Sequence, residues 1–387
     1  MITDLIIRFA QETLEVLDEE PYSDLDDIEE LLEDIDRRRQ DRNLNVAVIG
    51  EFSTGKSTFI NAFINRNILK TAWSATTAVP TYILFHAGEQ VKIIVTDCRR
   101  REYEPMDAYG REKLERYLDE SLPDDAENLL ARITTTDAWT QKLSMVKVYV
   151  PETTMPDNIC IIDTPGVNPG EEGTQKHVEA TQRVLRDYAD TAIVLFPAQA
   201  VYTGSFQKFL KANAEHFMHN AVFVITMKDL VCEEEWEDVA AYAAENLRDG
   251  FGIAHPVIYS CSAKYAAPGK KRKASDAHWK EEFDALRETI LERMKAERTQ
   301  IIEDKMDLLM RRLMEELEEE MLRSREYLKK TLDRITAISQ KQLQDDPEGF
   351  EASLHSFNRE RRNLEGRISR VENLYRQMEN YLECMGT

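Results

Sequence analysis

The sequence predicts an α/β fold: a doubly wound, mostly parallel sheet with an all-α helical bundle attached from both ends of the chain. Between residues 45 and 266, short β-branched apolar runs alternate with helical stretches, a pattern typical of parallel strands covered by helices. Residues 1–40 and 275–387 show apolar residues at helical spacing only. We therefore expect three segments: bundle helices in 1–42, the sheet domain in 43–268 and a helical hairpin in 275–387.

The N-terminal segment is expected to form two helices of the bundle. Apolar residues recur at helical spacing before and after Pro21, and proline interrupts a helix. In residues 43–268 we expect eight strands, at 46–49, 82–85, 91–95, 145–150, 159–162, 192–196, 221–225 and 257–260. The polar stretch 102–142 has a helical pattern and is expected to be an insertion on the sheet.

The C-terminal segment is expected to form an antiparallel hairpin. One apolar stripe runs from about residue 302 to 338, and a second runs from 350 to 382. The sequence DDPEG, residues 345–349, separates them and favours a tight turn. Stripes this long must pack against something, and we expect a three- or four-helix bundle with the N-terminal helices.

Composition limits the function classes. The formal net charge is −22, which disfavours broad binding to nucleic acid or anionic lipid. The 5 cysteines are scattered without CxxC spacing, as in proteins of a reducing compartment without a zinc site. No apolar run has the length of a membrane-spanning helix. We expect a cytoplasmic protein, either free or peripheral at a membrane, with no nucleic acid partner.

The sequence GEFSTGKST, residues 50–58, matches GxxxxGK[ST] between an apolar strand and a helix. In this geometry backbone N–H groups point at phosphate oxygens. Lys56 would reach the β- and γ-phosphates, and the Ser57 hydroxyl would bind Mg²⁺. The expected phosphate-loop contacts are Gly50, Glu51, Phe52, Ser53, Thr54, Gly55, Lys56, Ser57 and Thr58.

Three further motifs follow the ends of apolar strands, where open α/β sheets bind ligands. In IIDTPG, Asp163 would face Mg²⁺ and the Gly166 N–H would meet the γ-phosphate. In ITMKDL, Asp229 would accept hydrogen bonds from guanine N1–H and N2–H, which favours GTP over ATP. In YSCSAK, residues 259–264, the loop with Ser262, Ala263 and Lys264 would contact the base. The remaining expected nucleotide contacts are Thr226 and Lys228.

A threonine in the loop TTAVPT completes the expected metal site. Thr77, with Thr76 as the alternative, would sense the γ-phosphate through Mg²⁺. The phosphate loop and the three motifs at strand ends, in this order, predict a P-loop GTPase domain with Mg²⁺ as cofactor and GTP as substrate.

The motifs GEFSTGKSTFINAF, TTAVPT and DTPG, in this order, resemble the dynamin superfamily, particularly bacterial dynamin-like proteins. The resemblance implies that the terminal helices form a neck and stalk. It also implies GTP-dependent dimerisation through the GTPase face and hydrolysis coupled to a stalk swing, in membrane remodelling. Expected partners are a second copy and either a second dynamin-like protein or a membrane-bound protein, while direct lipid binding stays open.

The sequence departs from the family pattern at several positions. Met227 replaces the lysine of the guanine motif, which removes its charge unless Lys228 reaches back to the phosphate loop. Phe52 stands where animal dynamins carry a polar side chain, and Val167 stands where Ras-type enzymes carry glutamine. Catalysis would then depend on Lys56, Ser53 and Thr77, on backbone groups or on a dimer partner.

The helical part is shorter than the family's stalk, and its expected turn is acidic. It fits either a shortened chain or a natural short form that needs a partner for membrane contact. The alternative function is a nucleotide-gated switch or scaffold whose helical arms bind a protein partner, with little turnover and no membrane contact.

Overall fold

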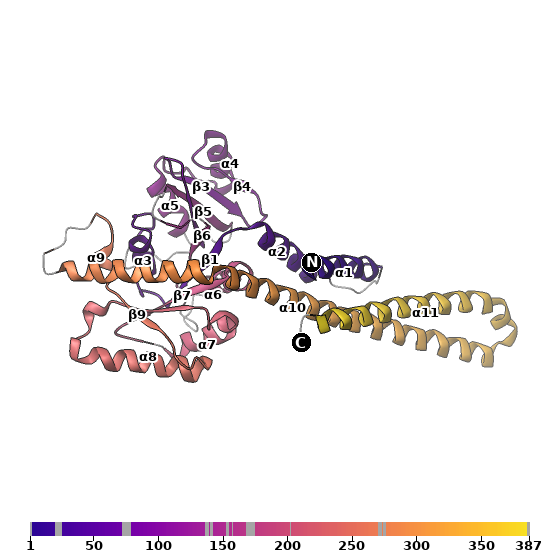
Figure 1. The fold of residues 1–387 in the computed structure, drawn as a ribbon. Coiled ribbons are helices and arrows are strands. Elements are labelled where there is room, and N and C mark those ends of the chain that lie inside the picture. Colours follow the sequence, from indigo (N-terminus) through magenta and orange to yellow (C-terminus); the bar gives the residue numbers. More distant parts are fainter. Residues whose placement is uncertain are drawn as a thin grey trace. The chain divides into compact units, whose positions relative to one another are not determined.

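The computed structural model describes residues 2–19, 25–71, 79–135, 139, 142–151, 155–156, 158–167, 175–201, 203–269, 273 and 276–384 (Figure 1). The chain divides into two compact units, Arg42–Ile302 and Met1–Asp41 with Glu303–Thr387. From the sequence we expected residues 275–302 in the helical hairpin, whereas the described part of this stretch belongs to the unit Arg42–Ile302, which contains the sheet. Phe283, Ile290 and Met294 account for this difference, because they are buried in the same apolar cluster as the strands.

The sheet of the first unit has nine strands in the order β4-β3-β5-β2-β6-β1-β7-β8-β9 (Figure 1). Five are mutually parallel: β1 (Leu44–Ile49), β6 (Ile159–Asp163), β7 (Thr191–Pro197), β8 (Val222–Thr226) and β9 (Ile258–Ser260). The pair β2 (Thr81–His86) and β5 (Leu143–Pro151) runs antiparallel to β6, while β3 (Lys92–Asp97) pairs antiparallel with β5 and with β4 (Glu102–Tyr103). The predicted strands and the mostly parallel sheet are confirmed. Strand β4 was not predicted, because two residues carry no alternation pattern.

Alternate residues of each central strand pack on opposite faces of the sheet. Leu44, Val46 and Val48 of β1 join one apolar cluster, and Ala47 and Ile49 join the other. The first cluster includes residues of α3 (Lys56–Phe63), α4 (Ala108–Leu118), α5 (Ala126–Thr135), α9 (Ala263–Ala266) and the start of α10 (Ala277–Asp345). The second includes residues of α6 (Gln175–Arg183), η2 (Val184–Tyr188), α7 (Gly204–Ala214), η3 (Glu215–Phe217) and α8 (Trp236–Phe251). Burial on both faces explains why these strands read as continuous apolar runs.

The second unit is built from α1 (Ile2–Leu17), α2 (Asp26–Gln40), the later part of α10 and α11 (Pro347–Cys384). The predicted turn is present, since α10 ends at Asp345 and α11 begins at Pro347, a position that proline favours. The Asp346 carboxylate accepts a hydrogen bond from the Gly349 N–H at 3.0 Å, which caps α11.

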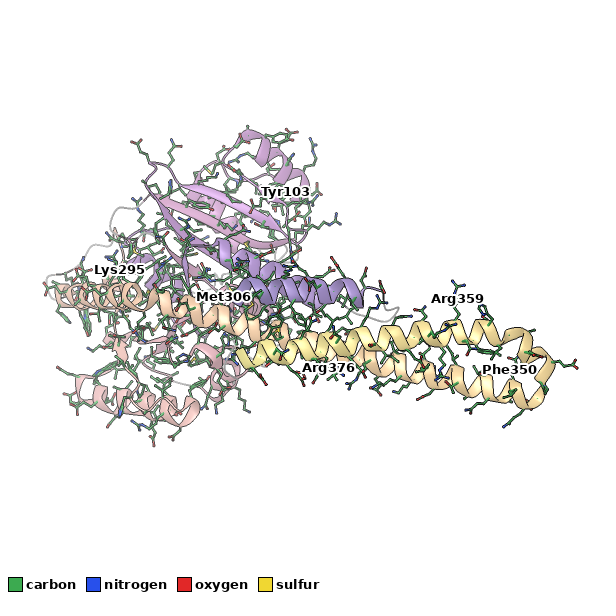
Figure 2. All side chains as sticks on the ribbon, turned by 45° about the vertical axis from the view of Figure 1, so that its right-hand side comes forward. Tyr103, Lys295, Met306, Phe350, Arg359 and Arg376 are labelled. Atoms are coloured by element: carbon green, nitrogen blue, oxygen red, sulfur yellow. The ribbon has the colours of Figure 1, made fainter. Side chains whose placement is uncertain are left out.

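The apolar core of this unit does not extend to the end of the hairpin. Between Leu328 and Leu364 no residue is buried, and the structure describes every residue of this stretch. Figure 2 marks Phe350 beside the turn and Arg359 farther along α11. Three apolar side chains in this stretch are notably exposed: Ile338, Leu343 and Leu354. In the described parts of the chain, we find no helix with the combined length and apolarity needed to cross a membrane.

Candidate nucleotide-binding site

The phosphate loop connects β1 to α3. Gly55 caps the helix in the left-handed region with φ +81°, and Ser53 also has a positive φ of 59°. A Cβ at Gly50 would lie 2.7 Å from Thr54 Oγ1 and 2.9 Å from the Leu195 carbonyl oxygen. The chain therefore needs glycine at position 50 for close packing against β7 and at 55 for its backbone conformation.

Lys56 is the first residue of α3 and lies almost fully buried at the centre of the loop. Its ammonium donates hydrogen bonds to the carbonyl oxygens of Gly50 and Glu51, both at 2.9 Å. Burial lowers the pKa of Lys56 to about 8, against the opposing effects of the Asp163 and Glu51 charges. A buried cation in a loop of backbone groups is suited to binding phosphate. Ser57 and Thr58 follow it in the first turn of α3.

Asp163 ends β6 and is completely buried. It pairs in register with Val48, two residues before the loop begins. Its carboxylate and the Ser57 hydroxyl are oxygen donors of the kind that Mg²⁺ prefers, so the donor chemistry fits that ion beside a nucleotide phosphate. Thr77 and its alternative Thr76 lie outside the described residues.

The Phe52 ring lies beside Gly166, in the segment that follows β6. A Cβ at Gly166 would lie 2.9 Å from Phe52 Cδ1 and 3.1 Å from Lys56 Nζ. The Phe52 ring also lies 5.8 Å from the His177 ring, measured between centroids. Gly166 thus lies close to Lys56, the residue that the sequence predicts to bind phosphate, and Phe52 presents carbon atoms beside it. Ser53 is exposed at the outer side of the loop.

Glu51 has a partner that sequence reasoning did not identify. Its carboxylate accepts a hydrogen bond from Thr203 Oγ1 at 2.7 Å. Thr203 is the N-cap of α7, where its hydroxyl accepts a hydrogen bond from the Phe206 N–H at 3.3 Å. Burial raises the pKa of the half-buried Glu51 carboxyl. The capping preference of threonine signals the helix start, but it gives no sign of the contact with the loop.

Thr226, at the end of β8, joins the turn of residues 227–230 to the phosphate loop. We name this turn the base-side turn, because the sequence predicts that its Asp229 contacts guanine. Its buried hydroxyl lies 2.8 Å from the Thr54 carbonyl oxygen and 3.3 Å from the Phe196 carbonyl oxygen. The next residue, Met227, has φ 59°, and its Cε lies 3.5 Å from the position of a Cβ on Gly55. The methionine side chain therefore ends against the phosphate loop without bringing a charge there.

Asp229 lies beside the loop that follows β9. Its N–H donates to Ser262 Oγ at 3.0 Å, and its carboxylate forms an ion pair with the Lys264 ammonium. Ser262 and Ala263 are buried, whereas Lys264 is partly exposed. The structure thus brings these four sequence-predicted residues together at the same sheet edge as the phosphate loop.

Lys228 points elsewhere. Its ammonium donates to Glu282 Oε1 on α10 at 2.6 Å, so it does not replace the missing lysine charge at the phosphate loop. The sequence motif placed Lys228 among the nucleotide contacts, and its side chain instead joins the turn to a helix.

Comparisons with known proteins match the part of the chain that contains the phosphate loop. Residues 46–228 match the model of the dynamin family. An uncharacterised protein from the xynA 3′ region of Caldicellulosiruptor sp. (strain Rt8B.4) is 24% identical over 274 residues, covering 70% of this chain and 61% of the relative. Dynamin-like protein 2 of Campylobacter jejuni subsp. jejuni serotype O:23/36 (strain 81-176) is 25% identical over 209 residues, covering 52% of this chain and 29% of the relative. The chain therefore matches less than two thirds of the length of each relative.

A solved structure described as "An oligomerised bacterial dynamin pair provides a mechanism for the long range sensing and tethering of membranes" aligns with 96% of this chain and 53% of its own, at 18% identity and a TM-score of 0.49. The family match covers most of β1, the phosphate loop, β6 and β8, and it ends at Lys228, before Asp229 and the loop after β9. The chain thus contains a dynamin-family GTPase domain at residues 46–228, and its curated relatives include bacterial dynamin-like proteins.

Proposed function

We propose that this protein binds and hydrolyses GTP with Mg²⁺, and that two copies pair through their GTPase faces. The observation that carries the proposal is the link from Thr226 to the Thr54 carbonyl. It ties the base-side turn to the phosphate loop, so that one nucleotide can meet both. Asp229 at that turn offers a carboxylate to the guanine N1–H and N2–H donors, whereas adenine presents an acceptor at N1.

Each residue near Lys56 has a proposed task. Lys56 leaves the Gly50 and Glu51 carbonyls and binds the β- and γ-phosphates, while the Gly166 N–H meets the γ-phosphate. Mg²⁺, held by Ser57, Asp163 and Thr77, would neutralise phosphate charge during transfer. Ser53 and Thr77 would orient water, because the Phe52 ring has no hydrogen-bonding group.

Phe52 is the reason for proposing that a second copy takes part in catalysis. A site with a phenyl ring beside the γ-phosphate position must obtain polar groups for the water from its own backbone, from Ser53 or from a partner. We propose that the partner's GTPase face completes the site and that turnover drives movement of the helical unit in membrane remodelling.

The alternative is a nucleotide-gated switch whose helical arms bind a protein. The hairpin stretch between Leu328 and Leu364 favours it, because no residue there is buried and the two helical arms are left available to a protein partner. The net charge of −22 also disfavours anionic lipid.

A binding and flotation experiment tests the proposal. Wild-type protein should bind GDP with Mg²⁺ more tightly than ADP, whereas Lys56→Ala should lose GDP binding. Replacement of the exposed Lys208 by alanine is the matched control and should keep it. Flotation of GTP-loaded protein with vesicles containing anionic lipid supports membrane action, while nucleotide binding without flotation or turnover supports the switch. Equal affinity for ADP and GDP would contradict guanine recognition by Asp229.

A further inference from the structure

The turn after β8 directs its two charged side chains to different partners. The Asp229 carboxylate pairs with Lys264, on the side where the base is expected. The Lys228 ammonium pairs instead with Glu282, in the second turn of α10, at 2.6 Å. The side chains of Lys228 and Glu282 are only 25% and 32% exposed, so the pair is less screened by solvent than a typical surface ion pair.

Two tryptophans also surround the Lys228 ammonium. Its Nζ lies 5.1 Å from the Trp236 ring centroid and 6.0 Å from the Trp279 ring centroid. Trp236 begins α8 and Trp279 lies in the first turn of α10. Cations within about 6 Å of an indole centroid are attracted to its face. The lysine is therefore held by groups from two helices as well as by its own turn.

The loop that meets Asp229 is anchored at the same place on α10. The Lys264 ammonium lies 4.8 Å from the Tyr265 ring centroid. The Tyr265 ring is stacked with Trp279 at 6.2 Å and an interplanar angle of 14°. Both segments that flank the expected base position, the turn after β8 and the loop after β9, therefore contact the first two turns of α10.

That part of α10 is itself fixed to the nucleotide-binding unit. Phe283 is fully buried and meets Phe59 of α3 edge to face, with ring centroids 5.6 Å apart. Helix α3 begins at the phosphate loop. The turn also contains Met227 in a backbone region that residues other than glycine rarely adopt. A turn of this kind keeps its conformation only when its surroundings hold it.

We propose that Lys228 is a positioning residue for base selection: its pair with Glu282 holds the turn so that Asp229 can discriminate guanine from other bases. This inference rests on the proposed binding of guanine nucleotides. Lys228 touches no nucleotide in this account. It acts through the backbone of the turn, so its loss should affect recognition of the base more than recognition of the phosphates.

A double-mutant cycle with two nucleotides tests the proposal. Inosine diphosphate (IDP) has the phosphates and N1–H of GDP but lacks the 2-amino group. The ratio of GDP affinity to IDP affinity therefore reports the hydrogen bond from the guanine 2-amino group to Asp229. We expect Lys228→Ala and Glu282→Ala each to lower this ratio about threefold to tenfold. The double variant should lower it no further than either single variant, because both remove the same contact. The charge-swapped protein, K228E with E282K, should recover most of the ratio.

The neighbouring pair Lys280 and Asp284 is the matched control. These residues form an exposed ion pair within α10, and replacing either by alanine should leave the GDP to IDP ratio unchanged. Thermal unfolding without nucleotide shows which variants fold, and Lys228→Arg supplies a conservative change that keeps the pair. A merely structural role would lower the unfolding temperature without changing the ratio.

The outcomes separate the two proposals. If wild-type protein prefers GDP to IDP and both alanine variants keep that preference, the positioning role is wrong while guanine recognition remains. Additive effects in the cycle would also overturn it, because they would show no coupling between Lys228 and Glu282. If wild-type protein binds neither GDP nor IDP, the proposed function fails and the inference fails with it.

Discussion

Replacing Thr226 by valine tests the link between the base-side turn and the phosphate loop. Valine nearly matches threonine in shape but removes the hydroxyl that lies 2.8 Å from the Thr54 carbonyl oxygen and 3.3 Å from that of Phe196. Thr226 is only 2% exposed, so water does not readily replace the donor. Leaving a buried acceptor without its donor costs roughly 1–3 kcal/mol. We expect the free energy of unfolding to fall by about that amount.

The same change should weaken nucleotide binding, because the free loop would no longer be held in its binding conformation. If the whole 1–3 kcal/mol must be recovered on binding, affinity falls by about fivefold to a little over a hundredfold. Calorimetric titration with GDP and ADP measures the loss, and both nucleotides should be affected because the phosphate loop serves both.

Thr226→Ser is the control for this prediction. Serine keeps the hydroxyl and loses the methyl group, so it should retain nucleotide affinity better than valine. If the valine variant binds GDP like the wild type while the serine variant is weakened, the hydrogen bond is not what positions the loop, and the reasoning is refuted.

Three further predictions concern the phosphate loop. Burial lowers the pKa of Lys56 to about 8, and phosphate favours its charged form, so GDP affinity should fall about tenfold from pH 7 to pH 9. Titrations below the ionisation of guanine N1–H test this. A Lys56→Arg variant that still binds should show no such fall, since arginine stays charged. Gly166→Ala places a Cβ 2.9 Å from Phe52 Cδ1 and 3.1 Å from Lys56 Nζ, so nucleotide affinity should drop about tenfold. Adding Phe52→Ala should restore part of the affinity. Unchanged affinity in titrations of Gly166→Ala would contradict the position of Gly166 beside Phe52 and Lys56. Met227→Lys brings an ammonium to the loop at Gly55 and should tighten GDP binding about tenfold, whereas equal or weaker binding would show that the methionine contact already supplies what the loop needs.

The sequence predicted those parts of the fold that depend on local patterns. The buried strands appear as apolar runs because both sheet faces are covered, and the turn at Asp346 follows from proline and glycine beside acidic residues. The first part of α10 was placed with the hairpin, because its apolar spacing is the same as that of the later helix. Only the three-dimensional structure shows that Phe283 packs on Phe59.

The candidate site likewise has residues that local motifs predict and contacts that only the three-dimensional structure shows. The positions of Lys56, Asp163 and Asp229 at the ends of strands could be predicted, because each motif directly follows or ends an apolar run. The contacts of Glu51 with Thr203 and of Lys228 with Glu282 join residues 152 and 54 positions apart. No local pattern encodes such pairs, since each depends on where a distant helix begins.

The most direct test of the proposed function is the rate of GTP hydrolysis per molecule as the protein concentration is raised from well below to well above micromolar. We expect the specific activity to increase with concentration, because a second copy completes a site in which the Phe52 ring offers water no hydrogen bond. We expect it to vanish in Lys56→Ala, which removes the ammonium proposed to bind the phosphates. A specific activity that stays flat and low across the whole range would contradict activation by pairing and would favour the nucleotide-gated switch.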